Sequence, residues 1–296
     1  MTADQNFALP DAELARLEAN FPARAVALSG GGSITVRSCG TGPAVVCLHG
    51  IGSGAASWLG TAMDLADQAQ VIAWDAPGYG ESTPVVPQAP WAVAYADRLR
   101  LLLDSLKIDR CILVGHSLGA LMAGAAAHAK DGLAERIARL VLISPARGYG
   151  APEQAESAAR VRTERLQTLD RLDVAGMAAE RSARLVSDQA SDTARAWVRW
   201  NMSRLNVGGY RQAVELLCGD DLLTYLPPAM PVRVLCGDQD VVTSPAACQQ
   251  VATACAVPLE LIADAGHACY VERPGAVAAV LAEEVQALRS QGRAQA

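Results

Sequence analysis

Residues 112–119 read Ile-Leu-Val-Gly-His-Ser-Leu-Gly, and a run of small residues follows directly. An apolar, partly β-branched run that ends in Gly-x-Ser-x-Gly and continues into an Ala-rich segment predicts a strand, a sharp turn and a helix. Gly115 and Gly119 flank the turn, where a Cβ would collide with neighbouring backbone. The turn presents the Ser117 hydroxyl outward and leaves the Leu118 amide free at a helix N-terminus. The stretch therefore predicts a nucleophile beside a donor for a developing negative charge.

Short apolar runs alternate with helix-like patterns on both sides of this stretch. Continuous apolar runs are typical of strands that are buried on both faces of a sheet. Strands alternating with helices indicate an α/β protein with a mostly parallel, doubly wound sheet and right-handed crossovers. The predicted strands are 24–29, 33–38, 44–48, 71–74, 111–114, 140–143, 232–236 and 259–262, and helices are predicted at 8–20, 57–67, 91–106 and 275–290.

The alternation stops between residues 147 and 228, where amphipathic, Arg- and Ala-rich helical patterns replace the strands. An insertion between consecutive strands is expected above the carboxyl ends of the sheet, where the loops gather. We therefore predict a core that is formed by residues 1–146 and 229–296, with an inserted helical cap, or lid, at 147–228.

One acidic and one basic side chain also follow predicted strands. Asp240 lies in the loop after 232–236, and His267 lies shortly after 259–262. Strand ends of a parallel sheet converge, so both are expected near Ser117. A serine needs a base, which His267 would supply, and a carboxylate that orients the base, which Asp240 would supply. Asp238 is the competing acid.

Five motifs resemble those of the α/β-hydrolase fold family, in the same order along the chain. The resemblance covers about residues 24–146 and 229–290 and implies that the amide of Ile51 is a second oxyanion donor beside Leu118. Within the family, a compact core with a helical lid is similar to 3-oxoadipate enol-lactonases, small-ester hydrolases and the carbon–carbon hydrolases of aromatic-ring degradation. The motifs are His49-Gly50-Ile51-Gly52, Asp75-x-x-Gly78-x-Gly80-x-Ser82, Gly115-His116-Ser117-Leu118-Gly119, Gly237-x-x-Asp240 and Gly266-His267.

A second interpretation competes at the first of these motifs. Gly50-x-Gly52-x-x-Ala55 follows a strand, and Asp75 ends the next one, which imitates a dinucleotide-binding fingerprint. We favour the oxyanion loop, because the fingerprint explains neither the serine turn nor the acid and histidine that follow later strands.

The remaining candidates concern substrate contacts and the other histidines. His49 is expected to brace the oxyanion loop, His116 to pack under the serine turn, and His128 to have no special role. By their position beside Asp240 and His267, Val241 and Tyr270 are candidates for substrate binding. Further candidates in the lid are Trp197, Trp200 and Tyr210, and Arg147, Arg162, Arg165 and Arg199 for a substrate carboxylate.

Composition excludes several other classes of protein. The formal charge of −6 and the absence of a basic patch argue against nucleic acid and anionic membranes as partners. Residues 2–6 lack the pattern of a secretory signal, and no apolar run is long enough to span a membrane. Eight cysteines without metal-ligand spacing indicate a reduced, cytoplasmic protein, and the four histidines predict no metal site. We expect no cofactor. The sequence contains no heptad pattern, so it does not indicate the oligomeric state.

Together these features predict a serine hydrolase that cleaves a small carboxylic ester or lactone through Ser117, His267 and Asp240. Hydrolysis of a carbon–carbon bond in a ring-fission product is the alternative with the same residues. A non-catalytic or nucleotide-binding α/β protein is the alternative from a different class.

Overall fold

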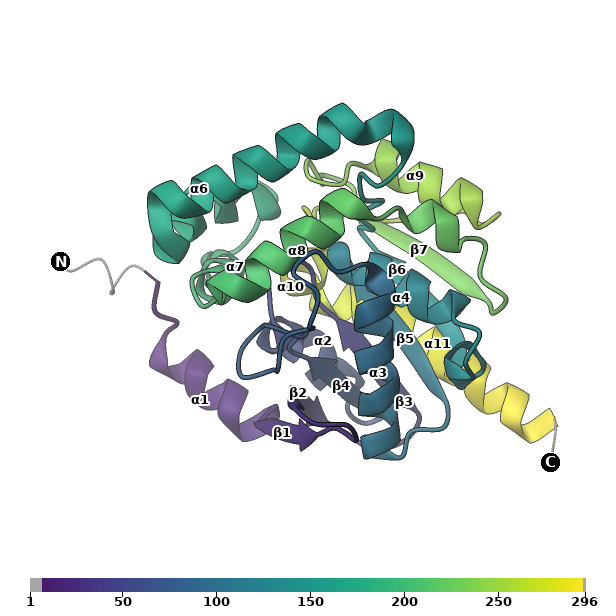
Figure 1. Cartoon of the computed structure of the whole chain (residues 1–296). Helices are drawn as coiled ribbons and strands as arrows, with labels where there is room; N and C mark the ends of the chain where they lie inside the picture. Colours follow the sequence, from purple (N-terminus) through teal and green to yellow (C-terminus); the bar gives the residue numbers. More distant parts are fainter. Residues whose placement is uncertain (1–6, 295–296) are drawn as a thin grey trace.

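The computed structural model describes residues 7–294, so the predictions for residues 2–6 and for the last part of the polar tail lie outside the described residues. Its centre is a single sheet of eight strands in the order β1-β2-β4-β3-β5-β6-β7-β8 (Figure 1). β1, β2 and β4 pair antiparallel, and every pair from β4 onward is parallel. The strands are β1 (Ala23–Ala27), β2 (Ser33–Cys39), β3 (Ala44–Leu48), β4 (Gln70–Trp74), β5 (Cys111–His116), β6 (Ile137–Ile143), β7 (Val232–Gly237) and β8 (Leu259–Ile262).

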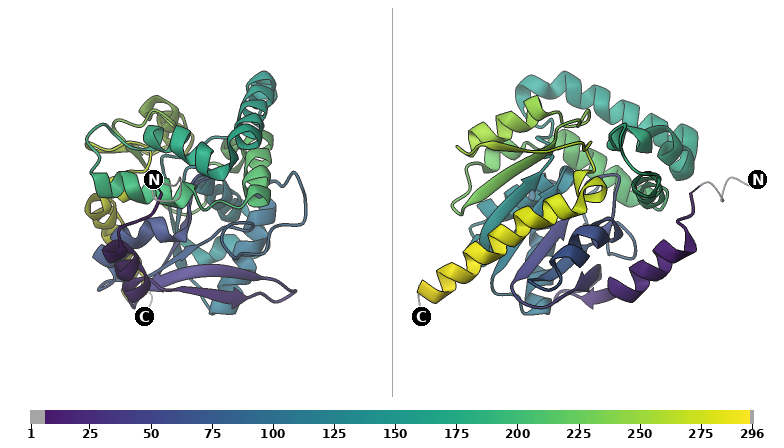
Figure 2. Two further views of the ribbon diagram at one scale, coloured as in Figure 1. Left: turned by 90° about the vertical axis from the view of Figure 1, so that its left-hand side faces the viewer. Right: turned by 180° about the vertical axis from the view of Figure 1, so that it is seen from behind.

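Helices cover both faces of the sheet (Figures 1 and 2). The helices are α1 (Asp11–Asn20), α2 (Leu59–Leu65), α3 (Ala92–Leu106), α4 (Leu118–His128), α5 (Leu133–Arg136), α6 (Ala155–Arg181), α7 (Asp192–Met202), α8 (Val207–Gly219), α9 (Pro245–Ala254), α10 (Cys269–Glu272) and α11 (Pro274–Ala294), with the 3₁₀ helices η2 (Ala55–Trp58), η3 (Pro152–Gln154), η4 (Ser182–Leu185) and η5 (Leu222–Tyr225). The mostly parallel, doubly wound sheet that the sequence predicts is confirmed.

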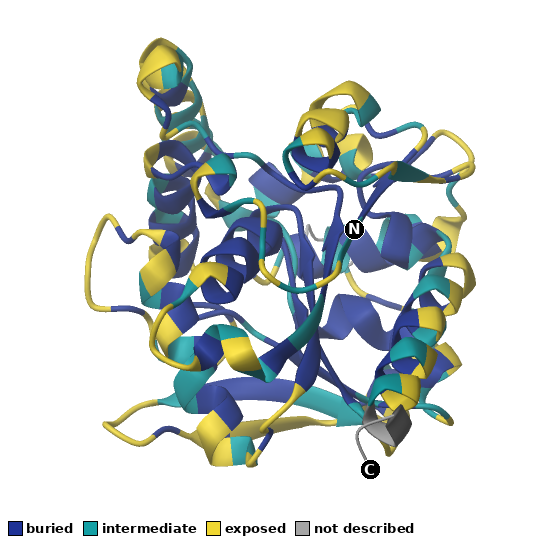
Figure 3. Cartoon of the chain, turned by 90° about the vertical axis from the view of Figure 1, so that its right-hand side faces the viewer, coloured by how far each residue is buried: buried dark blue, intermediate teal, exposed yellow. Residues whose placement is uncertain are grey.

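The central strands separate two hydrophobic clusters. β3 shows this directly, because Val46 and Leu48 face one cluster while Val45 and Cys47 face the other, as the two-residue period of a strand requires. The first cluster packs under α3, α4 and α9, and the second under α1, α2 and α11. Figure 3 shows the resulting pattern, in which the central strands are buried, while exposed residues lie on the outer sides of the helices, in loops and in the edge strand β1.

The segment between β6 and β7 contains only helices among its regular elements in the described part of the chain, namely η3, α6, η4, α7, α8 and η5. The backbone leaves the helical conformation inside α6 at Asp173, which has φ 58° and ψ −174°. The Asp173 carboxylate accepts a hydrogen bond from the Gly176 amide at 2.8 Å, which is the contact of an N-cap residue. α6 is therefore two consecutive helices that change direction at Asp173. The division of the chain into a core and a separate lid domain stays a prediction.

Three helices that the sequence analysis did not predict are α5, α9 and α10. For α9 a local signal is present, because the Ser244 hydroxyl accepts a hydrogen bond from the Ala247 amide and Pro245 occupies the first turn. No helix among the described residues is long and apolar enough to cross a membrane.

A glycine pair holds α8 against the loop that follows β4. A Cβ on Gly209 would lie 3.0 Å from the Gly78 Cα and even closer to the Gly78 carbonyl, which are backbone atoms that cannot rotate away. Gly208, the preceding residue of the same helix, has no atom within 4 Å of such a Cβ.

We predict that Gly209→Ala lowers the free energy of unfolding by about 1–3 kcal/mol, because α8 must move away from the loop. Gly208→Ala is the matched control. We expect it to raise the free energy of unfolding by less than about 1 kcal/mol. Urea denaturation of the three proteins measures both effects. Equal stability of the two variants would contradict this account of how α8 is anchored.

Candidate active site

Ser117 occupies the turn between β5 and α4, in a backbone conformation that is rare for a residue with a side chain. Its φ is 52° and its ψ is −117°. A Cβ on Gly115 would lie 2.6 Å from the Ala120 Cα, and one on Gly119 would lie 2.7 Å from the His49 carbonyl oxygen. The turn is therefore possible only with glycine at both positions, as the sequence predicts.

Three backbone hydrogen bonds hold this strained residue in place. The Ser117 amide donates to the Ile143 carbonyl at 3.0 Å, and the Ser117 carbonyl accepts from the amides of Ala120 at 3.0 Å and Ala146 at 3.1 Å. β6 and the start of α4 thus fix the direction in which the Ser117 hydroxyl points.

Asp240 and His267 meet across the ends of β7 and β8. His267 Nδ1 lies 2.9 Å from Asp240 Oδ2, and both side chains are buried. The other carboxylate oxygen accepts from the amides of Val242 at 2.7 Å and Thr243 at 2.9 Å. Burial alone would raise the pKa of Asp240, but the charge and hydrogen bond of His267, together with these amides, hold it at about 2. Asp240 is therefore ionised at neutral pH and orients the imidazole.

Asp238, the competing acid, has a different role. Its carboxylate accepts a hydrogen bond from the Ala265 amide at 3.2 Å, so it supports the loop after β8. In the described residues no hydrogen bond joins Asp238 to His267, and none joins the Ser117 hydroxyl to His267. A hydrogen bond between a nucleophile and its base, such as that between Ser117 and His267, often forms only when substrate is bound.

Thr243 is a member of this group that the sequence analysis missed. Its hydroxyl lies 2.9 Å from Asp240 Oδ2, 3.1 Å from His267 Nδ1 and 2.9 Å from the Ser144 carbonyl. A hydroxyl has one proton, so it donates to only one of these groups at a time. Its place three residues after Asp240 is the only local signal in the sequence.

His116 connects the serine turn to the loop that carries His267. Its Nε2 lies 2.9 Å from the His267 carbonyl, which only accepts, so Nε2 carries the proton. Burial, and to a lesser extent the neighbouring His267, lower the pKa of His116 to about 3. Its Nδ1 is buried without a hydrogen-bond partner among the described residues, so a second proton there would have no acceptor. The sequence analysis assigned His116 to packing and missed this contact.

The backbone amides of Ile51 and Leu118 are both available at the site. Neither donates a hydrogen bond within the part of the chain that is described, and both residues line the cavity beside Ser117. His49 holds the first of the two loops, because its Nδ1 lies 2.8 Å from the Gly50 carbonyl and its Nε2 accepts from the Ala76 amide at 2.9 Å. This geometry matches the bracing that the sequence analysis expects of His49.

Asp75 does not have the position that a dinucleotide-binding protein would require. Its carboxylate accepts a hydrogen bond from the Ala55 amide at 2.8 Å, so it points into the loop that follows β3 instead of toward a ribose. This contact favours the interpretation of the glycines as an oxyanion loop.

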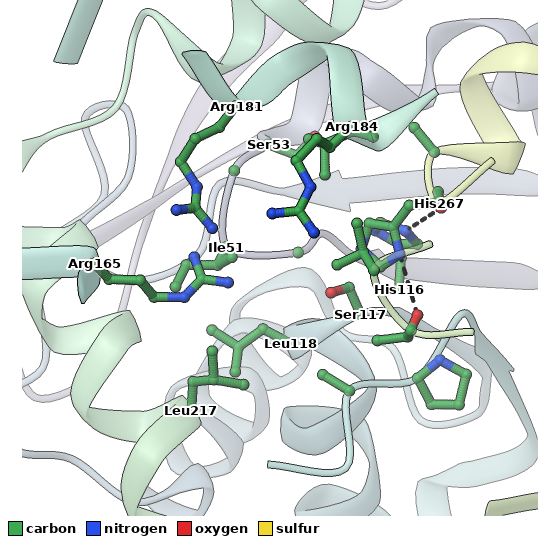
Figure 4. Close-up of a pocket in the computed structure, with 18 of the residues that line it drawn as sticks. Ile51, Ser53, His116, Ser117, Leu118, Arg165, Arg181, Arg184, Leu217 and His267 are labelled. Atoms are coloured by element: carbon green, nitrogen blue, oxygen red, sulfur yellow. Dashed lines mark hydrogen bonds between the residues drawn. The ribbon is translucent and has the colours of Figure 1, made fainter. Parts of the chain in front are cut away.

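A cavity of about 630 Å³ lies between the strand ends and the helices of 147–228, and Ser117 and His267 line it (Figure 4). Tyr270 lines it as expected, with its hydroxyl 3.0 Å from the Ser57 hydroxyl. Val241 does not: its side chain is 66% exposed, and the next residue, Val242, lines the cavity instead.

The expectation that Trp197 and Trp200 line the cavity is wrong for the described structure. The Trp197 indole donates to Glu13 of α1 at 2.9 Å, and Trp200 stacks under the Arg204 guanidinium at 4.7 Å. Both tryptophans therefore pack α7 against its surroundings. Tyr210, in contrast, lines the cavity.

Of the arginines that the sequence analysis named, some line the cavity and others do not. Arg147 and Arg165 line the cavity, but Arg147 is paired with Asp221 at 2.9 Å. Arg162 is paired with Glu215 at 2.9 Å, and Arg199 lines a second, smaller cavity. Arg181 and Arg184, which the sequence analysis did not name, also line the main cavity.

A mostly parallel sheet with a serine on a strand–turn–helix elbow is the architecture of the α/β-hydrolase fold. A model of the alpha/beta hydrolase family matches residues 45–280, so the chain belongs to that family. Solved structures of similar fold include an esterase of Thermogutta terrifontis, with a TM-score of 0.75 and 24% identity over 89% of this chain and 98% of that one. Another is an enol-lactonase of Burkholderia xenovorans, with a TM-score of 0.75 and 22% identity over 88% and 98%.

Curated relatives match a shorter part of the chain. A 2-hydroxy-6-oxononadienedioate/2-hydroxy-6-oxononatrienedioate hydrolase of Pseudomonas putida is 35% identical over 112 residues, which are 36% of this chain and 38% of the relative. An uncharacterized protein of Mycobacterium tuberculosis is 40% identical over 109 residues, 36% of this chain and 30% of the relative. The matches therefore span well under half of either protein.

The buried His116 predicts a stability that depends on pH. Since its folded pKa of about 3 lies below the unfolded value of 6.5, the unfolded chain binds more protons between these values. The free energy of unfolding therefore falls as the pH drops from about 6.5 toward 3, with a contribution of about 1.4 kcal/mol per pH unit. His116→Gln, whose amide can donate to the same carbonyl, is expected to lose this contribution.

Urea denaturation at several pH values measures the two slopes. His128→Gln removes an exposed histidine from α4 and serves as the control. If wild type and His116→Gln lose stability equally on acidification, His116 is not held neutral in the folded protein.

Proposed function

We propose that the protein is a serine hydrolase that cleaves a small carboxylic ester or lactone through an acyl-enzyme. Ser117 is the nucleophile, His267 the general base and Asp240 the carboxylate that orients it. The observation that carries this proposal is the buried hydrogen bond between Asp240 and His267, at the edge of the cavity into which the Ser117 hydroxyl opens. Membership of the alpha/beta hydrolase family supports it.

The reaction follows from these positions. His267 takes the hydroxyl proton as Ser117 attacks the carbonyl carbon, and Asp240 stabilises the imidazolium that forms. The amides of Ile51 and Leu118 donate to the oxyanion of the tetrahedral intermediate. His267 then protonates the leaving alcohol. It next removes a proton from the water that attacks the acyl-enzyme, and the acid leaves with Ser117 restored.

Cleavage of a carbon–carbon bond by the same three residues is the second candidate. The specific observation in its favour is the partial match to curated hydrolases of 2-hydroxy-6-oxo dienoates. Turnover of a ring-fission dienedione, compared with turnover of an ester panel, separates the two candidates. The lid at 147–228 and a cytoplasmic location remain part of the proposal, and they rest on the sequence pattern.

We predict that the wild-type protein hydrolyses short-chain p-nitrophenyl esters and that Ser117→Ala lowers kcat by on the order of 10⁶-fold, because no other group replaces the nucleophile. A fluorophosphonate probe is expected to label the wild type and not the variant. Ester turnover that survives in Ser117→Ala would overturn the proposal. Absence of labelling, together with dinucleotide binding in a calorimeter, would favour the non-catalytic alternative.

A second pair of variants tests the acid. Asp240→Asn is expected to lower kcat by about 10⁴-fold, because the imidazole loses the charge that stabilises its protonated form. Asp238→Asn, two residues away in the same loop, is the matched control and is expected to stay within about tenfold of wild type, since among the described residues its carboxylate binds only a backbone amide. The reverse pattern in steady-state kinetics would assign the acid to Asp238.

A further inference from the structure

Three arginines of the helical segment share the cavity with Ser117. Figure 4 shows the guanidinium groups of Arg165, Arg181 and Arg184 pointing into the same space, above Ile51 and Leu118. Arg165 comes from the first half of α6, Arg181 ends its second half, and Arg184 lies in η4. The change of direction at Asp173 is what allows two distant parts of α6 to face one cavity.

These arginines differ from their neighbours in having no carboxylate partner. Arg147 and Arg162 each form an ion pair with an acidic residue, whereas Arg165, Arg181 and Arg184 form none with any described residue. Arg165 has one hydrogen bond, from its Nη1 to the Tyr210 hydroxyl at 3.3 Å. A cluster of cations without counter-charges is unusual, because like charges repel and guanidinium groups favour carboxylate or phosphate oxygens.

The local charge is also opposite to that of the chain as a whole. The protein carries a formal charge of −6, so a concentration of positive charge at one place does not follow from composition. Glu164 is the one acidic side chain among the described residues that line the cavity, and it is largely exposed and lies 4.0 Å from Arg160. Burial, followed by the proximity of Arg165, lowers the pKa of Arg181. A bound anion would relieve this repulsion.

We propose that Arg165, Arg181 and Arg184 form a subsite for an anionic group, a carboxylate, that the substrate carries away from the bond that is cleaved. This inference rests on the proposed function, which it makes more specific: the substrate is an ester or lactone with a free acid group. Guanidinium groups bind carboxylates with two parallel hydrogen bonds, so the cluster both selects the acid and directs the substrate carbonyl toward Ser117.

Paired substrates test the subsite in the intact protein. The mono-p-nitrophenyl esters of glutaric and adipic acid are compared with p-nitrophenyl pentanoate and hexanoate, which lack the distal acid. We expect kcat/KM to be at least about tenfold higher for the acidic esters, because hydrogen bonds to charged groups are strong. Arg165→Gln, Arg181→Gln and Arg184→Gln are each expected to raise KM for the acidic esters about ten- to a hundredfold. KM for the neutral esters is expected to change less than about threefold.

Arg171→Gln is the control, since Arg171 is an exposed residue of α6 that pairs with Glu180 outside the cavity. It is expected to behave as wild type with both kinds of ester. Arg184 is an exposed residue, so Arg184→Gln is expected to preserve folding even if the other two variants do not. Equal kcat/KM for acidic and neutral esters in the wild type would overturn the subsite, as would equal effects of the arginine variants on both.

A binding measurement separates failure of the subsite from failure of the proposed function. Ser117→Ala is titrated calorimetrically with adipate and with inorganic phosphate, with and without Arg184→Gln. Binding of adipate that weakens at least about tenfold in the double variant supports the subsite even if no ester is hydrolysed. No adipate binding, or tighter binding of phosphate, would overturn the assignment to a carboxylate.

Discussion

The site depends on how closely the start of α4 approaches the end of β3. A Cβ on Gly119 would lie 2.7 Å from the His49 carbonyl, and one on Gly50 would lie 2.9 Å from the Ser117 Cβ, so only glycine permits this approach. The approach brings the loop of Ile51 beside the N-terminus of α4, so that Ile51 and Leu118, whose amides donate no hydrogen bond among the described residues, line the same cavity as Ser117. Replacing either glycine would push these two segments apart, so the proposed pairing of a nucleophile with oxyanion donors depends on a backbone contact.

The parts of the structure that the sequence predicts are those that local patterns determine. β3 is found at 44–48 as expected, because a strand buried on both faces has to be continuously apolar. The serine turn is recognisable because close backbone contacts leave glycine as the only choice two residues before and two residues after Ser117. The proximity of Asp240 and His267 follows from topology, since both come after strands of one parallel sheet. These predictions need no knowledge of how helices pack.

The parts that the sequence did not predict depend on contacts between distant segments. Nothing near Trp197 indicates that its indole donates to Glu13 of α1, which turns it away from the cavity. The convergence of Arg165 and Arg181 depends on the change of direction at Asp173, and the polar, Ala-rich pattern of α6 continues through that point with no proline and with its one glycine, Gly176, three residues later. For Thr243 the sequence shows a hydroxyl near the acid but not that it lies between the acid and the histidine.

Packing differs between the strand that precedes the proposed nucleophile and the helix that carries most of the proposed subsite. All six residues of β5, which precede Ser117, are buried, whereas only four of the 27 residues of α6 are. Residues that perform catalysis need positions fixed to a fraction of an ångström, which a buried strand provides. An arginine that binds a carboxylate tolerates more movement, because its long side chain adjusts to the anion. A charge-based subsite can therefore occupy the less buried helix without loss of selectivity, and a bound anion would add contacts where packing is sparse.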